Sequence, residues 1–166
     1  MAPEPETAEL LAHTPVFQDV PLDGLTSLAA QGSRRVFAAQ AVLMRQGDPA
    51  DCMHVIVRGQ VRVTRSHPAL TALVLLAELS AGETVGEMGV LDGDVRSATA
   101  TAVEETETLE IRAEALSDLL LRFPGVAAAL LRLLSKRIRN TNQLIERSLT
   151  RQSNRPEGRL REERPV

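Results

Sequence analysis

The chain has 166 residues, a length typical of one domain with terminal extensions. Hydrophobic residues make up 43% of the chain and aromatic residues only 2%, so the core must be built from aliphatic side chains. The single cysteine excludes an intramolecular disulfide, and no apolar run suits a secretory signal or a membrane span, so a cytoplasmic protein is expected.

The net charge of −3 is distributed unevenly along the chain. Residues 1–33 contain five acidic and no basic residues, whereas residues 132–166 contain ten basic and four acidic residues. A basic segment of this kind suits nucleic acid or an acidic partner. Charge runs more often form a solvated helix face and a charged tail, and we prefer this interpretation.

Two short helices are predicted in residues 1–33, which form an N-terminal helical segment. The first spans Thr7 to His13 with Thr7 as its N-cap, and the second spans Leu22 to Gln31 and ends at Gly32. Proline residues lie between the two helices and separate them.

Residues 34–112 change to a pattern of short strands separated by turn residues. The predicted strands are Arg35–Ala38, Ala41–Arg45, Met53–Arg58, Gln60–Ser66, Leu73–Leu79, Ser97–Val103 and Thr106–Arg112. Many short strands at regular spacing are typical of an antiparallel barrel or jelly roll. The fold class is therefore predicted to be α+β, with helices on both sides of a strand-rich segment in the sequence.

Helical periodicity returns in residues 113–149. One helix is predicted from Arg112 to Arg122, and Pro124-Gly125 then opens a longer helix that runs to about Leu149. A mainly apolar stripe recurs along it at steps of three or four, formed by Val126, Leu130, Leu134, Ile138, Thr141, Ile145 and Leu149. This helix could cover the barrel, pair with a copy of itself, or do both. Residues 150–166 are predicted to be a disordered charged tail.

The segment from Gly86 to Ala98 combines a carboxylate, a guanidinium, a hydroxyl and three glycines within one loop. Arg96 can form a bidentate pair with phosphate oxygens, and Glu87 can accept a hydrogen bond from a ribose hydroxyl. The glycines allow backbone N–H groups to come close to a ligand. The loop is therefore predicted to bind a small phosphorylated sugar.

The order of these motifs resembles the cyclic nucleotide-binding domain family, to which the catabolite activator protein and the regulatory subunit of protein kinase A belong. The resemblance covers roughly residues 10–148. It rests on the sequences VLMRQGDPAD at 42–51, LSAGETVGEMGVL at 79–91 and RSAT at 96–99, and on a strand pair that turns at Gly59. It implies an antiparallel β-roll, a jelly-roll-like barrel, with flanking N-terminal helices and a C-terminal helix that covers the ligand or forms a dimer.

The resemblance implies that the loop is the family's phosphate-binding cassette. Glu87 would bind the ribose 2′-hydroxyl and Arg96 the cyclic phosphate. The other implied contacts come from the backbone N–H groups of Gly86, Met88 and Ala98, from close approach at Gly89 and from the hydroxyl of Ser97. The segment from Gly86 to Val90 would form a short helix with its N-terminus toward the anion. An Arg96 buried with no phosphate beside it should be hydrated or paired with an acid.

The resemblance also assigns a role to the long helix, which would contact the base and transmit the signal. Alignment on Lys136-Arg137-Ile138 places Thr141 and Asn142 at the base, although both residues also suit an exposed helix surface or a dimer seam. Ser97 is compatible with cAMP and with cGMP, and mildly favours cAMP.

The predicted function is a sensor of cAMP or cGMP that changes the position of its C-terminal helix when the ligand binds. We expect no enzymatic activity, no cofactor and no metal site, because His13, His54 and His67 form no ligand motif and Ser97 has no histidine at a catalytic spacing. The alternative is a nucleotide-independent interaction module that acts through the long helix and the basic tail.

The expected partners are the cyclic nucleotide, a downstream protein that the sequence does not identify, and a second copy of the chain bound through the C-terminal helix. Relatives of the catabolite activator type continue into a winged helix-turn-helix, whereas fewer than twenty residues follow the long helix here. Direct binding of DNA is therefore not expected of this chain, and neither is binding to a membrane.

Overall fold

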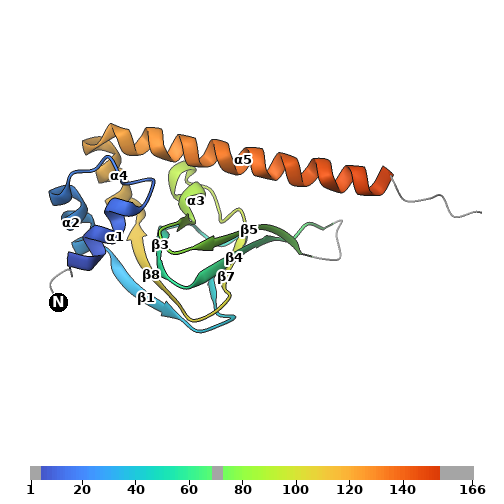
Figure 1. Ribbon diagram of the computed structural model, residues 1–166, viewed down its shortest axis with the longest axis horizontal. Helices are drawn as coiled ribbons and strands as arrows, with labels where there is room; N and C mark the ends of the chain where they lie inside the picture. The colour runs from blue at the N-terminus through green and yellow to red at the C-terminus, as the bar shows by residue number, and fades with distance from the viewer. Residues whose placement is uncertain (1–4, 69–72, 154–166) are drawn as a thin grey trace, which may run out of the picture. The chain divides into compact units, whose positions relative to one another are not determined.

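Two four-stranded antiparallel sheets form the centre of the fold. The computed structural model describes residues 5–68 and 73–153, and its sheets have the strand orders β1-β8-β3-β6 and β2-β7-β4-β5 (Figure 1). The strands are β1 (Ser33–Phe37), β2 (Val42–Met44), β3 (Cys52–Arg58), β4 (Gln60–Arg65), β5 (Val74–Ser80), β6 (Thr84–Val85), β7 (Thr99–Ala102) and β8 (Thr106–Arg112). The predicted α+β class and jelly-roll-like β-roll are confirmed.

The helices flank this roll in the sequence and one interrupts it. They are α1 (Pro5–His13), α2 (Leu22–Gln31), α3 (Glu87–Asp92), α4 (Ala113–Arg122) and α5 (Pro124–Ser153). Helix α5 extends from the first of two compact units, residues 1–133, into the second, residues 134–166. It ends four residues later than predicted, and the remainder of the predicted tail lies outside the described residues.

The predicted N-cap role of Thr7 is wrong. Helix α1 already includes Pro5, so Thr7 lies within its first turn. The Thr7 hydroxyl instead accepts a hydrogen bond from Arg34 Nη2 at 2.8 Å, and Thr7 is only 4% exposed. A long-range contact to strand β1 thus uses the hydroxyl that the local pattern assigned to capping.

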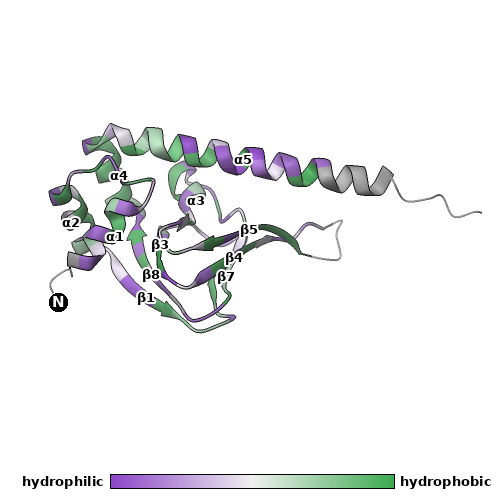
Figure 2. Ribbon diagram, in the orientation of Figure 1, coloured by the Kyte–Doolittle hydropathy of each residue, from purple (hydrophilic) through white to green (hydrophobic). Residues whose placement is uncertain are grey.

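Alternation along β3 divides its side chains between two environments. Met53 and Val55 are fully buried in an aliphatic cluster that includes Leu109 of β8 and residues of α1, α2, α4 and the start of α5. Helix α4 and strand β8 both carry hydrophobic and hydrophilic residues (Figure 2), and their buried hydrophobic residues belong to this cluster. Burial of each large aliphatic side chain contributes about 1.5–3 kcal/mol, so this cluster fixes the helices on the outer face of the sheet.

The opposite face of β3 lines the interior of the roll. Ile56 packs there against residues from both sheets, in a second cluster formed by Met44, Val61, Leu79, Val85 and Ala100. Cys52 and His54 share the face of Ile56 because they precede it by four and two residues. The interior of the roll is therefore apolar around Ile56 and polar around Cys52 and His54.

Candidate functional site

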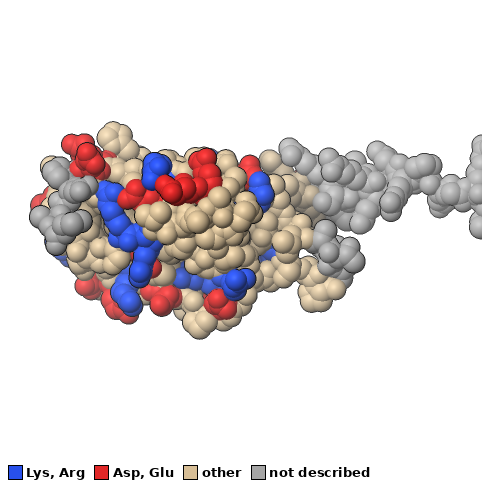
Figure 3. Space-filling view, turned by 90° about the horizontal axis from the view of Figure 1, so that it is seen from below, with Lys and Arg blue, Asp and Glu red and all other residues tan. Residues whose placement is uncertain are grey.

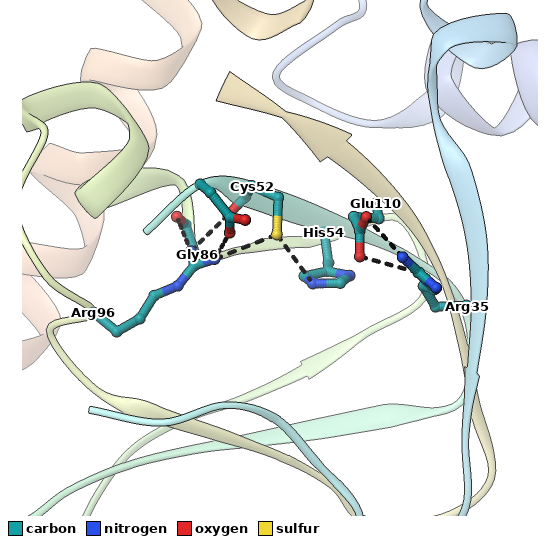
Figure 4. A network of polar contacts seen from close by, with 7 residues as sticks. Arg35, Cys52, His54, Gly86, Arg96 and Glu110 are labelled. Carbon is teal, nitrogen blue, oxygen red and sulfur yellow. Dashed lines mark hydrogen bonds and ion pairs between the residues drawn. The ribbon is translucent and has the colours of Figure 1, made fainter. Parts of the chain in front are cut away.

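Arg96 is the buried cation of the cassette, and only 5% of the residue is exposed. Its Nη1 donates hydrogen bonds to the carbonyl oxygens of Cys52, at 2.6 Å, and Gly86, at 3.0 Å (Figure 4). Its Nη2 donates to Cys52 Sγ at 3.3 Å and lies 3.6 Å from Asp51 Oδ1. A buried guanidinium is expected to be hydrated or paired with an acid, and here the carboxylate of Asp51 is an acidic partner.

The Asp51 carboxylate is the solvent-facing partner of Arg96. The Asp51 side chain is 73% exposed, whereas the two carbonyl oxygens that bind Nη1 belong to the folded framework of β3 and the cassette. The Asp51 contact is also longer than either of those hydrogen bonds. An anion arriving from solvent could therefore replace Asp51 while the contacts of Nη1 remain.

The backbone of Arg96 is tied to the loop that follows β2. Arg96 N donates to the carbonyl oxygen of Asp48 at 2.8 Å, and Gly47 N donates to the carbonyl oxygen of Arg96 at 2.9 Å. These two bonds form a short ladder between segments distant in the sequence. They hold the end of the cassette in a fixed position, so the guanidinium is placed by backbone as well as side-chain contacts.

Two glycines of the cassette are required by its geometry. Gly86 has φ +88, and a Cβ there would lie 2.8 Å from Arg96 Nη1 and 2.7 Å from Met44 Cε. A Cβ on Gly89 would lie 2.5 Å from the Cβ of Ala50. All three distances are far below van der Waals contact, so helix α3 approaches Arg96 and the Ala50 loop only because these positions lack side chains.

The other predicted cassette residues occupy contrasting environments. Glu87 is fully buried in the first turn of α3, where a negative charge is favourable, while Met88 is 41% exposed. Ser97 is half-buried, and its hydroxyl donates to Met88 Sδ at 3.7 Å. The contacts of Arg96 with Gly86 and of Ser97 with Met88 bring the two ends of the cassette together. Ala98 follows Ser97 directly and is half-buried.

The two predicted residues of the long helix lie elsewhere. Thr141 and Asn142 are on α5 in the second unit, beyond residue 133. Their contact with a ligand base stays a prediction.

A cavity of about 330 Å³ opens beside Arg96 in the roll. Its polar lining includes Arg35, Cys52, His54, Arg96 and Glu110, and the close-up shows these side chains from β1, β3, β8 and the cassette gathered together (Figure 4). Of the predicted site residues, only Arg96 lines it. The cavity therefore joins the cassette to a polar cluster that the sequence analysis did not identify.

Burial dominates the ionisation of two groups in this cluster. It lowers the pKa of His54 to about 4, because desolvation penalises the imidazolium, and it raises the pKa of the Cys52 thiol for the same reason. Arg96 acts in the opposite direction on Cys52, since its positive charge favours the thiolate. His54 is therefore neutral near pH 7, and Cys52 is a thiol with a cation beside it.

The polar residues of the cavity that were not predicted, such as His54 and Glu110, could be brought together only with knowledge of the strand register. In the pairing of β3 with β8, His54 lies directly opposite Glu110, and in the pairing of β1 with β8, Ser33 lies opposite Glu110. The alternation of the predicted strand at Met53–Arg58 could place His54 inside the roll, but nothing local indicates which residue of a distant strand faces it.

Several charged side chains on the described surface form ion pairs. Figure 3 shows one face of the molecule, on which basic side chains lie beside acidic ones. The ion pairs include Arg35–Glu110 and Arg58–Glu105, each at 3.1 Å, and Arg62–Glu78 at 2.9 Å, and Arg34 is paired with Glu107. On this face the charges do not form a single basic patch of the kind that binds nucleic acid.

Within the described residues, every helix is too short or too polar to cross a membrane.

Comparison with known proteins gives a consistent family. A sequence model described as "Cyclic nucleotide-binding domain" matches residues 34–123. The "Cyclic AMP receptor protein" of Thermus thermophilus is 33% identical over 129 residues, which are 78% of this chain and 59% of that protein. The chain thus spans less than two thirds of the length of this relative.

Solved structures agree with the sequence comparison. The catabolite activator protein of Thermus thermophilus superposes with a TM-score of 0.70 at 32% identity, over 80% of this chain and 62% of that one. A cyclic nucleotide-binding domain from Methylobacillus flagellatus gives a TM-score of 0.72 at 27% identity, over 86% of this chain and 82% of that one. The similarity therefore includes helices as well as the roll.

Proposed function

The chain belongs to the cyclic nucleotide-binding domain family, and on this premise we propose that it is a cAMP sensor whose ligand binds at the cassette from Gly86 to Ala98. The observation that carries the proposal is the environment of Arg96. Its side chain is 5% exposed, and its guanidinium is oriented by two carbonyl oxygens and paired on one side with an exposed carboxylate. This arrangement suits a guanidinium that binds an anionic ligand, rather than one that only stabilises the fold.

Binding would proceed as an exchange of anions on Arg96. The cyclic phosphate takes the place of the Asp51 carboxylate on Nη2, while Nη1 keeps its hydrogen bonds to Cys52 and Gly86. An anion compensates the charge on the guanidinium before and after the exchange, so binding adds no further desolvation cost for Arg96. The phosphate gains charge-assisted hydrogen bonds, which are stronger than those between neutral groups.

Recognition of the rest of the nucleotide would use the remainder of the cassette. Glu87 would accept a hydrogen bond from the ribose 2′-hydroxyl, and Ser97 would exchange its weak contact with Met88 Sδ for a phosphate oxygen. A hydroxyl-to-sulfur contact is a poor hydrogen bond, so this exchange is favourable. Backbone N–H groups of the cassette would complete the phosphate site, since Gly86 and Gly89 permit close approach. Ser97 favours cAMP over cGMP only mildly.

The output of the sensor would pass through α5. A ligand that contacts Thr141 and Asn142 shifts the equilibrium between two helix positions by no more than the difference in its binding free energy for them.

The long helix also carries exposed apolar residues. Leu131, Ile138 and Ile145 recur at intervals of seven residues and are 65%, 60% and 54% exposed. This spacing suits a seam between two parallel helices, so we propose a homodimer. The downstream protein is not identified, and a cytoplasmic location stays a prediction.

A thermal-shift comparison of cAMP, cGMP and cyclic dinucleotides tests the proposal. A ligand that binds only the folded state raises the unfolding midpoint, and we expect cAMP to give the largest increase. Arg96→Ala should lose most of this shift, because it removes the counter-charge of the phosphate. Arg62→Ala is the matched control and should keep the shift, because the partner of Arg62, Glu78, lies outside the cassette. No shift with any of these ligands would favour the nucleotide-independent interaction module.

A further inference from the structure

Three side chains of metal-ligating type converge in the polar interior of the roll, outside the cassette. They are Cys52 and His54 of β3 and Glu110 of β8, and one ligand atom from each lies within 4.8 Å of the other two. Cys52 and His54 are 9% and 3% exposed. All three line the cavity of about 330 Å³ beside Arg96.

The separation of the first two ligand atoms matches a tetrahedral centre. Cys52 Sγ and His54 Nε2 are 3.8 Å apart. With bonds of about 2.3 Å to sulfur and about 2.0 Å to nitrogen, a tetrahedral zinc ion holds such a pair about 3.5 Å apart. The close-up shows the thiol and the imidazole turned toward each other and the Glu110 carboxylate beside the imidazole (Figure 4). Only a small adjustment of side chains would bring all three atoms onto one ion.

Neighbouring residues already orient these ligands. His54 Nδ1 lies 3.0 Å from the Thr108 hydroxyl, a contact that leaves Nε2 directed at the thiol. Glu110 forms a two-point pair with Arg35, at 3.1 and 3.2 Å. Metal-ligating imidazoles and carboxylates are held by hydrogen bonds of this kind, which fix the ring and the carboxylate before the ion arrives.

We propose that Cys52, His54 and Glu110 form a zinc site in the interior of the roll, with the fourth position of the metal open to the cavity. One sulfur, one nitrogen and one oxygen ligand is a set that suits zinc rather than magnesium or calcium, which prefer oxygen alone. Coordination transfers the thiol proton of Cys52 to solvent, and no oxidation or reduction takes place. His54 supplies the lone pair of Nε2.

The ion would share one ligand, Cys52 Sγ, with Arg96. Arg96 Nη2 donates to Cys52 Sγ at 3.3 Å, and a metal-bound thiolate remains a hydrogen-bond acceptor, so the two contacts are compatible. Replacement of the thiol proton by a divalent ion adds one net positive charge beside the guanidinium. The electrostatic potential in the cavity therefore becomes more favourable for an anion. The metal site lies next to the nucleotide site but is not part of it.

Cobalt substitution tests the zinc site directly. Addition of Co²⁺ to the full chain is expected to give one equivalent of bound metal with a thiolate-to-cobalt charge-transfer band and the intense visible bands of a tetrahedral ion, and Zn²⁺ is expected to abolish both. The chain has one cysteine, so the charge-transfer band can only come from Cys52. Cys52→Ser is expected to remove the band, and His54→Gln and Glu110→Gln to weaken binding at least tenfold.

Matched variants separate the site from general effects. His13→Gln replaces an exposed histidine, and Glu107→Gln replaces another β8 carboxylate paired with an arginine of β1, so both should bind cobalt like the parent. If Cys52→Ser fails to fold, X-ray absorption of the zinc-loaded parent gives the same answer, with one sulfur neighbour expected. Absence of a sulfur neighbour, or cobalt binding equally tight in His54→Gln and His13→Gln, overturns the proposal. Neither readout depends on cyclic nucleotide.

Discussion

Asp51→Asn should increase the affinity of the chain for cAMP. Asp51 occupies the side of Arg96 that the cyclic phosphate must take, with Oδ1 3.6 Å from Nη2. The asparagine keeps the size of the side chain but removes its charge, so the phosphate no longer displaces a carboxylate. A variant that binds its ligand more tightly is an unusual result for removal of a polar contact, which makes the direction of the effect informative.

The magnitude follows from the exposure of the ion pair. The Asp51 side chain is 73% exposed, although that of Arg96 is 5% exposed, so solvent screens the pair on one side. Solvent-exposed ion pairs contribute about 0–1 kcal/mol, and the upper half of that range corresponds to roughly two- to fivefold in Kd. We therefore expect Asp51→Asn to lower the Kd of cAMP by roughly two- to fivefold, and the gain should shrink as salt is added.

Competition with a fluorescent cAMP analogue, followed by anisotropy at low and high salt, measures this change. Asp48→Asn is the matched control, because Asp48 also lines the cavity and its backbone carbonyl accepts a hydrogen bond from Arg96 N, a contact that the substitution keeps. General relief of negative charge would affect both variants equally. An Asp51→Asn variant that binds cAMP no more tightly than Asp48→Asn would refute the exchange of anions on Arg96.

Three further variants test the fold, the buried histidine and the helix seam. Gly89→Ala should lower the free energy of unfolding by about 1–3 kcal/mol in urea titration, because its Cβ would lie 2.5 Å from another Cβ. Gly125→Ala should leave this free energy unchanged, because the nearest atom to its Cβ would lie 3.5 Å away. Equal losses in the two variants would contradict the close approach of α3. In metal-free protein, the unfolding free energy should fall by about 3 kcal/mol as the pH falls from 6.5 to about 4, because the unfolded chain protonates His54 first. His54→Gln should flatten this fall, and an unchanged slope would show that other groups cause it. Ile138→Glu should convert a dimer to a monomer in light scattering, and an unchanged mass would exclude α5 as the seam.

Local patterns predicted most of the secondary structure. Helix α2 begins and ends at the predicted residues, and the start of α5 at Pro124 follows from the fixed φ of proline. Strand β6, Thr84–Val85, was missed because two residues are too few to show alternation. It exists because its backbone pairs with His54 and Val55 of β3, a contact that no local pattern contains.

The candidate site was predictable where it is local in sequence. Gly86 and Arg96 lie ten residues apart and meet at 3.0 Å, as a single loop allows. The contact of Arg96 with Cys52 on β3 could not be predicted, because it depends on how the cassette folds back over the strand. The pairing of His54 with Glu110 depends likewise on the register of two distant strands. Residues that share one loop could be grouped from the sequence, whereas contacts assembled by sheet topology could not.

Calorimetric titration of cAMP into the parent chain, Arg96→Ala and Arg62→Ala tests the central claim most directly. Loss of the charge-assisted hydrogen bond from Arg96 Nη2 to the phosphate, about 1.5–3 kcal/mol, should weaken binding to Arg96→Ala by roughly ten- to a hundredfold. The parent and Arg62→Ala should bind one cAMP per chain with the same affinity. Equal affinity of all three proteins, or no binding by the parent, would contradict a nucleotide site built on Arg96.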